Sequence, residues 1–161
     1  MLLRGERKLS IPKSVVKIRK NGVEYTSCVD RAKYTMRELT RAALRDVGRY
    51  ISRSCNTEAM KLPGLKHSRR TRGKTSAFQF WVRKQETDLQ VGIKHDTWYG
   101  TEQELGDSKQ PKRGILRNTT NNNIPQIVEI ESRYLSALEN EAEALRLIES
   151  EGDYRGGGDD D

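Results

Sequence analysis

The stretch "VDRAKYTMRELTRAALRDVGRYISRSC" (Val29–Cys55) constrains the fold more than any other part of the chain. Apolar residues recur in it at steps of three and four, which is the spacing of one face of an α-helix. We therefore predict a long amphipathic helix that ends near Cys55, before the breaker "NTEAMKLPG". Its predicted apolar stripe consists of Val29, Ala32, Met36, Leu39, Ala43, Val47 and Tyr50.

A second long helix is predicted from about Ile124, with Pro125 tolerated in its first turn. The segment "NTTNNN" (Asn118–Asn123) before it indicates a polar break. Burial is expected for Leu39 in the first helix and Leu138 in the second, so that aspartate at either position would unfold the domain. The predicted apolar face of the second helix is Ile127, Ile130, Tyr134, Leu138, Ala142 and Leu145.

Two β-hairpins are also predicted. In "VVKIRKNGVEY" (Val15–Tyr25) an Asn-Gly pair separates two short runs, which favours a tight hairpin turn. The β-rich runs "FQFWVRK" and "LQVGIKH" are separated by "QETD" and predict a second hairpin. Asp96 is expected to cap a short helix over Trp98–Leu105 that stops at Gly106. The expected fold is α+β: a small antiparallel sheet packed by two long amphipathic helices, with a short helix and a long basic loop.

Length and composition indicate one domain with a modest core. The chain has 161 residues, of which 34% are hydrophobic and 33% are charged, so further burial could come from neighbouring subunits. We expect a basic N-terminal arm at residues 1–14, a single domain at 15–151 and a disordered acidic tail at 152–161. Neither a transmembrane helix nor a secretory signal is expected.

The net charge of +7 hides an uneven distribution. Residues 1–74 hold 20 lysines and arginines against 6 acidic residues, a balance of +14, whereas residues 119–161 hold 3 against 11, a balance of −8. The middle segment, 75–118, holds 7 against 6. A uniformly basic chain would favour a nucleic-acid binder. A basic front with an acidic back also lets the two ends, or two copies of the chain, attract one another.

Candidate catalytic and metal-binding groups are sparse. His67 and His95 have no Cys, Asp or Glu at metal-ligand spacing, and Glu102 and Glu104 would diverge on a helix. The only cysteines, at positions 28 and 55, are too few for a metal motif and are expected to be reduced thiols. We therefore expect no enzyme activity, no metal and no cofactor.

Five arginines recur at every fourth residue of the first predicted helix and form a slowly winding basic ridge. Glu38 and Asp46 can each reach the arginine three residues later, and the other three arginines have no evident partner within the helix. Besides a solvated helix face, the ridge could pair with the acidic C-terminal helix of a neighbour or border a DNA channel. The ridge comprises Arg37, Arg41, Arg45, Arg49 and Arg53.

The segment "KLPGLKHSRRTRGKTS" (Lys61–Ser76) is predicted to be a mobile basic loop. A charged loop is often only a solvated surface, but a long loop on a small domain also offers a place for a partner to dock. The candidate docking residues are Lys66, Arg69, Arg70, Arg72 and Lys74.

The stretch "WYGTEQELGDSKQPKRGILR" (Trp98–Arg117) resembles the signature of the head–tail joining, or tail-completion, proteins of long-tailed bacteriophages. The order of elements around it is similar too, so the resemblance covers about residues 29–145. Two features depart from the family: Asp107 stands where Thr is frequent, and the basic loop lacks the usual "P-x-x-T-G" type of segment. The residues that carry the resemblance are Trp98, Tyr99, Glu104, Leu105, Gly106, Ser108, Gln110, Pro111 and Leu116.

The resemblance implies a structural protein of the virion neck without enzymatic activity. It would form a homo-oligomeric ring of six or twelve copies between the connector or stopper protein and the tail tube or tail terminator, around the channel for genomic DNA. Such a protein is made in the cytoplasm of the host bacterium and involves no membrane. The alternative hypothesis, a small non-specific nucleic-acid-binding protein, rests on the basic first 74 residues.

Within the signature, Trp98, Tyr99 and Leu105 are expected in the core, while Gly106 supplies a positive-φ stop and Pro111 stiffens the following loop. The loop itself is the expected interface with other subunits or partners. Its candidate residues are Asp107, Ser108, Lys109, Gln110, Pro111, Lys112 and Arg113.

Overall fold

A computed structural model describes residues 16–61, 77–83, 87–94, 104–108 and 111–152. The predictions for the N-terminal arm, the acidic tail and both histidines lie outside these residues. So do those for the docking residues Lys66, Arg69, Arg70, Arg72 and Lys74, for Trp98 and Tyr99, and for Lys109 and Gln110.

The described chain has an α+β fold, as predicted. Its strands pair as two separate antiparallel hairpins, β1 with β2 and β3 with β4. In chain order the elements are β1 (Val16–Lys20), β2 (Val23–Ser27), α1 (Val29–Lys61), β3 (Phe78–Val82), β4 (Leu89–Ile93), α3 (Ile115–Asn122), α4 (Ile124–Ser136), the 3₁₀ helix η1 (Ala137–Glu139) and α5 (Glu141–Gly152).

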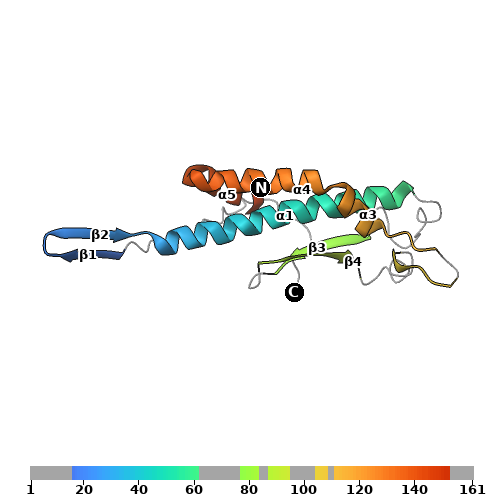
Figure 1. The fold of residues 1–161 in the computed structure, drawn as a ribbon, viewed down its shortest axis with the longest axis horizontal. Coiled ribbons are helices and arrows are strands. Elements are labelled where there is room, and N and C mark those ends of the chain that lie inside the picture. Colours follow the sequence, from blue (N-terminus) through green and yellow to red (C-terminus); the bar gives the residue numbers. More distant parts are fainter. Residues whose placement is uncertain (1–15, 62–76, 84–86, 95–103, 109–110, 153–161) are drawn as a thin grey trace, which may run out of the picture.

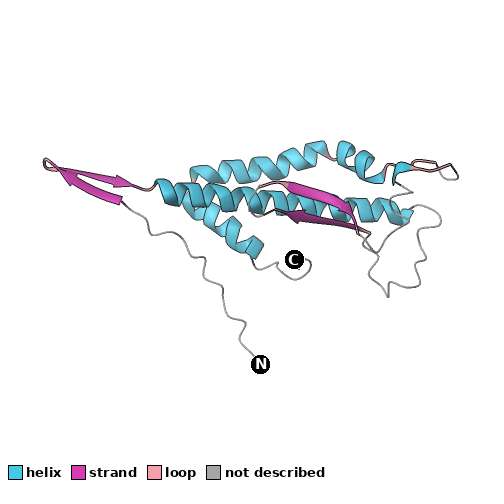
Figure 2. Cartoon of the chain, turned by 90° about the horizontal axis from the view of Figure 1, so that it is seen from below, coloured by secondary structure: helices cyan, strands magenta, loops and turns pink. Residues whose placement is uncertain are grey.

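Helix α1 is the scaffold on which the described elements pack. It contacts β3, β4, α3, α4 and α5. Figure 1 shows α4 and α5 on one side of α1 and the β3–β4 hairpin on the other, and Figure 2 shows the same hairpin lying along α1. The prediction that both long helices pack on one sheet was therefore wrong, because α1 separates the sheet from α4 and α5.

Burial along α1 follows the predicted stripe only from Leu39 onward. The buried apolar residues there are spaced by three and four, as a helix packed on two sides requires. Val29, Ala32 and Met36 were predicted to be buried and are exposed, Met36 by 54%. At the start of α1, Arg31 pairs with Glu141 of α5 and Thr35 is buried, so one side of these turns is covered, while Val29, Ala32 and Met36 lie on the uncovered side.

The prediction that α1 ends near Cys55 was also wrong, because the helix continues to Lys61. In this extension, two polar side chains bond back to the preceding turn. Asn56 donates to the Ser52 carbonyl at 2.8 Å, and Thr57 donates to the Arg53 carbonyl at 3.0 Å. Asn56 also receives the Phe78 N–H at 3.1 Å and so joins β3 to α1.

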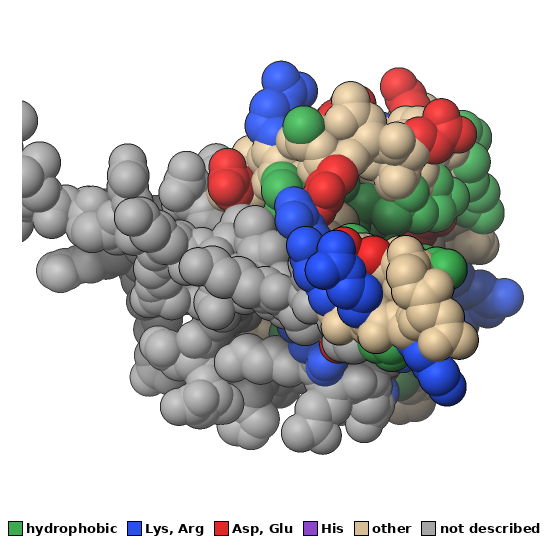
Figure 3. Space-filling model, turned by 90° about the vertical axis from the view of Figure 1, so that its left-hand side faces the viewer, with side chains coloured by type: hydrophobic (Ala, Val, Ile, Leu, Met, Phe, Trp, Pro, Cys, Tyr) green, Lys and Arg blue, Asp and Glu red, His purple; other side chains and the backbone are tan. Residues whose placement is uncertain are grey.

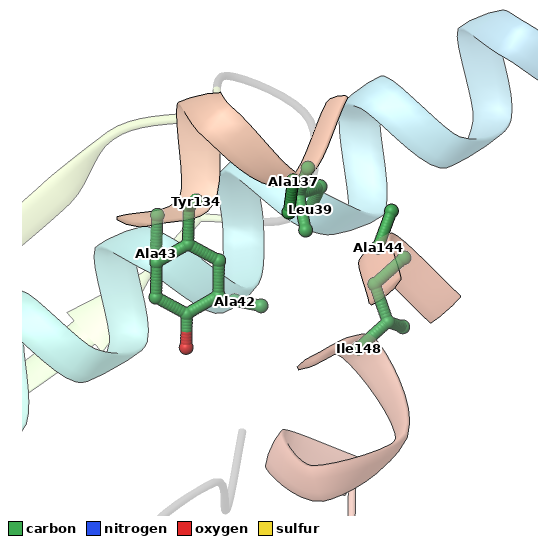
Figure 4. Packing of buried hydrophobic residues seen from close by; sticks show 7 residues of the cluster. All are labelled: Leu39, Ala42, Ala43, Tyr134, Ala137, Ala144 and Ile148. Atoms are coloured by element: carbon green, nitrogen blue, oxygen red, sulfur yellow. The ribbon is translucent and has the colours of Figure 1, made fainter. Parts of the chain in front are cut away.

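Two apolar clusters form the core of the described chain. The first joins the middle of α1 to the C-terminal helices, with Tyr134 packed over the alanines of α1 (Figure 4). It contains Leu39, Ala42, Ala43, Tyr134, Ala137, Ala144 and Ile148. The second lies further along α1, against the sheet and α3, and contains Val47, Ile51, Cys55, Phe78 and Ile115. Both clusters use α1, so the two halves of the fold depend on the same helix.

The C-terminal region is not one straight helix. The "NTTNNN" segment, predicted as a polar break, belongs mostly to α3, whereas the start of α4 at Ile124 with Pro125 in its first turn is confirmed. After η1 the chain bends at Asn140, whose side chain accepts the Ala142 N–H at 3.1 Å. The buried face passes through Ala137 in η1 and, after the bend, through Ala144 and Ile148, so Leu138 and Ala142, predicted to be buried, are exposed.

The N-terminal hairpin forms as predicted. Asn21 and Gly22 both have positive φ, 53° and 78°, which is the backbone of the turn that an Asn-Gly pair favours. The hairpin projects from the N-terminal end of α1 (Figures 1 and 2). It therefore extends the molecule along its long axis rather than adding to the core.

Candidate functional site

The signature stretch folds into a loop that is closed at its base by Glu104. The Glu104 carboxylate accepts the Leu116 N–H through both oxygens, at 3.0 and 3.1 Å, and the Arg117 N–H at 3.4 Å. The Gly114 N–H donates to the Glu104 carbonyl at 3.2 Å. Glu104 thus caps the N-terminus of α3, where free N–H groups and the helix dipole favour a carboxylate.

Two glycines allow this closure. Gly106 has φ +78°, and a Cβ at this position would lie 2.7 Å from the backbone nitrogen of Lys112. Gly114, which precedes α3, has φ +58° and offers no side chain to cap the helix, so Glu104 takes that role from ten residues away. The positive φ predicted for Gly106 is confirmed. The reason for a glycine is twofold: the backbone conformation, and the close approach of the two sides of the loop.

The loop presents an exposed surface. Asp107, Ser108, Pro111 and Lys112 are exposed, and Arg113 is partly buried. Leu105, expected in the core, is 65% exposed. The prediction of a core position was wrong because Glu104, and not its neighbour, faces α3.

Replacing Glu104 by alanine should destabilise the chain by about 1–2 kcal/mol, since it removes the side chain that, among the described residues, caps the N-terminus of α3. Chemical denaturation would measure this loss. Glu104→Gln keeps one acceptor oxygen and should lose less, and Glu129→Ala, an exposed glutamate on α4, is the matched control. Equal midpoints for Glu104→Ala and Glu129→Ala would show that the cap contributes nothing.

The five arginines of α1 do not form one uniformly exposed ridge. The two predicted pairs are present: Arg41 with Glu38, and Arg49 with Asp46 at 2.8 Å. Both paired arginines are partly buried, as is Arg45, whereas Arg37 and Arg53 are exposed. Part of the positive charge is therefore neutralised within the helix.

Asp46 accepts hydrogen bonds from three side chains, and two of these contacts were not predicted from the sequence. Besides the bond from Arg49, the Asp46 carboxylate accepts a hydrogen bond from Arg133 Nη2 at 2.8 Å and one from Tyr134 Oη at 2.5 Å. The Arg133 guanidinium also lies 5.2 Å from the centre of the Tyr134 ring. These contacts fix α4 against α1. Only the tertiary fold brings the partners together, so helical spacing could predict the Arg49 pair but not the other two.

The two cysteines differ sharply. Cys28 is exposed and Cys55 is fully buried, and both are free thiols. Burial raises the pKa of Cys55 from 9.0 to about 11; a hydrogen bond with Thr119 lowers it in part, and the charges of Glu104 and Glu58 raise it further. The fold therefore favours the neutral thiol.

This pKa gives a pH-dependent prediction. Because the folded-state pKa of Cys55 exceeds the unfolded value, its stabilising contribution is complete below about pH 9 and is lost as the pH rises towards 11. Urea unfolding at several pH values should show a smaller alkaline loss of stability for Cys55→Ala than for Cys28→Ala. An equal loss of stability per pH unit in the two variants would contradict the raised pKa of Cys55.

The described residues contain no group of three or more His, Cys, Asp or Glu side chains placed to hold a metal ion. Among the helices of the described ranges, none has the length and apolar composition needed to cross a membrane. Comparison with family models, with curated proteins and with solved structures gave no match to this chain.

Proposed function

We propose that the chain is a structural subunit of the neck of a long-tailed bacteriophage, where copies form a ring between the capsid connector and the tail tube. The observation that carries the proposal is the loop closed by Glu104. Three described residues of the signature shape this loop: Glu104 caps α3, Gly106 allows the close approach of the two sides, and the backbone N–H of Leu116 donates to the Glu104 carboxylate. Side chains held in this way suit an interface better than a reaction centre.

The exposed side of the loop supports the same proposal. Three exposed residues lie beside the closed base of the loop: apolar Leu105, rigid Pro111 and charged Lys112. A docking partner can therefore contact all three types of group. The main chain beside these side chains is held by the Glu104 hydrogen bonds, so a partner that docks there has less backbone to order, which favours association. The signature is thus explained as a preformed contact surface for another subunit or neck protein.

Non-specific binding of nucleic acid is the second candidate function. The observation in its favour is the balance of +14 over residues 1–74. Within α1, however, Arg41 and Arg49 are paired with acidic residues and partly buried, so they are poorly placed for phosphate contact. The charge in the described part of α1 therefore favours a protein partner, although genomic DNA passing through a ring would still meet a basic subunit.

Mass measurement tests the proposal directly. The purified 18.5 kDa chain, alone and mixed with connector and tail-tube proteins of the same phage, should give a ring of six or twelve copies or a defined complex with one of them. The double variant Leu105→Lys, Lys112→Glu should fold normally and lose that complex, whereas Glu129→Gln should retain it. A chain that stays monomeric with every neck protein, and binds DNA with a steep salt dependence, would overturn the proposal in favour of the second function.

A further inference from the structure

Helix α4 carries two apolar faces, and only one of them is covered by described elements. Ile127, Ile130 and Tyr134 pack against α1. A different set of apolar residues recurs at steps of four, seven and three, which places them on one side of the helix, and all of them are exposed. This apolar stripe consists of Ile124, Val128, Leu135 and, in η1, Leu138.

The surroundings of the apolar stripe are acidic. Ile124–Glu139 carries Glu129, Glu131 and Glu139 against the single basic residue Arg133, a balance of −2. Glu131 lies on the same side of α4 as the stripe, three residues after Val128 and four before Leu135. Arg133 is held by Asp46, so its charge is partly neutralised. A partner for the stripe therefore needs exposed apolar side chains together with positive charge.

The β1–β2 hairpin has that chemistry. Ile18 and Val23 are 53% and 68% exposed, and the hairpin carries three basic residues, Lys17, Arg19 and Lys20, against Glu24, a balance of +2. A two-stranded hairpin without further packing is marginally stable in water. The hairpin projects beyond the helices (Figure 1), so it gains little support from its own chain.

The hairpin is directed away from α4 of its own chain. It continues the axis of α1 past its N-terminal end, while α4 lies alongside α1 further along (Figures 1 and 2). Seen from the hairpin end, basic side chains gather near the middle of the view, and acidic and apolar side chains lie above them (Figure 3). Two complementary surfaces that one chain keeps apart can meet between two copies.

We propose that the β1–β2 hairpin of one copy docks on the apolar stripe of α4 in the next copy. Ile18 and Val23 then lose water against Val128 and Leu135, and Lys20, which lies on the same face of the hairpin, meets Glu131. Lys17 and Arg19 lie on the opposite face, where they pair with Glu24 at 3.4 and 3.9 Å. This contact joins two different faces of the chain, so repeating it builds a ring when the rotation between copies closes, as the proposed neck function on which this inference rests requires.

Cross-linking between single-cysteine copies tests the pairing. In a Cys28→Ser background, a tagged copy with Ile18→Cys is mixed with an untagged copy with Val128→Cys and oxidised; Cys55 stays unreactive because it is buried. In the matched control the untagged copy carries Met60→Cys instead of Val128→Cys. Met60 is about as exposed as Val128 but lies at the C-terminal end of α1, away from the apolar stripe. Mixed disulfide dimers should form with Val128→Cys and not with Met60→Cys.

A second variant checks the energetics without cysteines. Leu135 is exposed in the single chain, so the Leu135→Lys variant should melt normally. It should weaken self-association roughly tenfold, because burial of one leucine side chain accounts for an effect of that size. Oligomers that form normally with Leu135→Lys and without the Ile18–Val128 cross-link would reject the pairing but leave the ring intact. A single chain with both cysteines that closes an internal disulfide at high dilution would also reject it. A chain that never self-associates, alone or with neck proteins, would overturn both.

Discussion

Leu39→Asp is expected to unfold the chain. Leu39 is only 2% exposed and lies in the cluster that joins α1 to the C-terminal helices, among Ala42, Tyr134, Ala137 and Ile148. A carboxylate there would be buried among apolar groups without a positive partner. The cost is about 4 kcal/mol or more, comparable with the whole stability of a typical small domain. Circular dichroism should show a loss of helix at 25 °C or a collapse of the melting temperature.

Two matched variants make this test specific. Met36→Asp changes the same helix one turn earlier, at a side chain that is 54% exposed, and Leu138→Asp changes a residue of η1 that is 42% exposed. Both should remain folded, with losses within about 0.5–1 kcal/mol. Unfolding by Met36→Asp together with tolerance of Leu39→Asp would mean that α1 presents a different face to its neighbours.

These variants also mark where sequence periodicity succeeds and where it fails. Between Leu39 and Val47 the three-and-four spacing correctly predicted burial, since α1 is covered there by other elements. At Met36 the same spacing failed, because periodicity reports which side of a helix is apolar and not whether anything lies against it. The hairpin turn at Asn21-Gly22 was predictable because its backbone requirement is local.

The C-terminal helices show a second limit. A continuous apolar face from Ile127 to Leu145 was predicted without a break, but Asn140 interrupts it and caps α5. A signal was present: Asn followed three residues later by Glu143 is a pattern typical of a helix start. Because the break shifts the helical phase, the residues buried after it differ from those that a single helix would bury.

The loop of the candidate site was located from the sequence, but its construction was not. The resemblance identified Glu104, Gly106 and Leu116, whereas the hydrogen bonds from Leu116 to the Glu104 carboxylate depend on the folded loop. One clue was available in principle: a helix that follows Gly114 has no capping side chain of its own and needs an acceptor from elsewhere. The cluster around Asp46 offered no comparable clue, because Arg133 and Tyr134 are more than eighty residues away.

Gly48→Ala is expected to destabilise the chain by about 1–3 kcal/mol, opposite to the usual effect of this change in a helix. In an open helix interior, alanine is more stable than glycine by roughly 1 kcal/mol. Here a Cβ on Gly48 would lie 2.4 Å from Cδ2 of Phe80 and 2.7 Å from Cδ1 of Leu89. Since Gly48 is the point where α1 meets the β3–β4 hairpin, the sheet would have to move away from the helix.

The control for this prediction is Gly92→Ala in the same hairpin. A Cβ there would meet nothing nearer than the Trp81 ring at 3.7 Å, an ordinary contact, so its stability should be unchanged or slightly higher. Phe80→Leu in the Gly48→Ala background should recover part of the loss, since the smaller side chain leaves room for the new methyl group, and a double-mutant cycle in urea would measure that coupling. If Gly48→Ala instead raises the unfolding midpoint, β3–β4 does not pack closely on α1, and the arrangement with α1 between the sheet and the C-terminal helices would have to be abandoned.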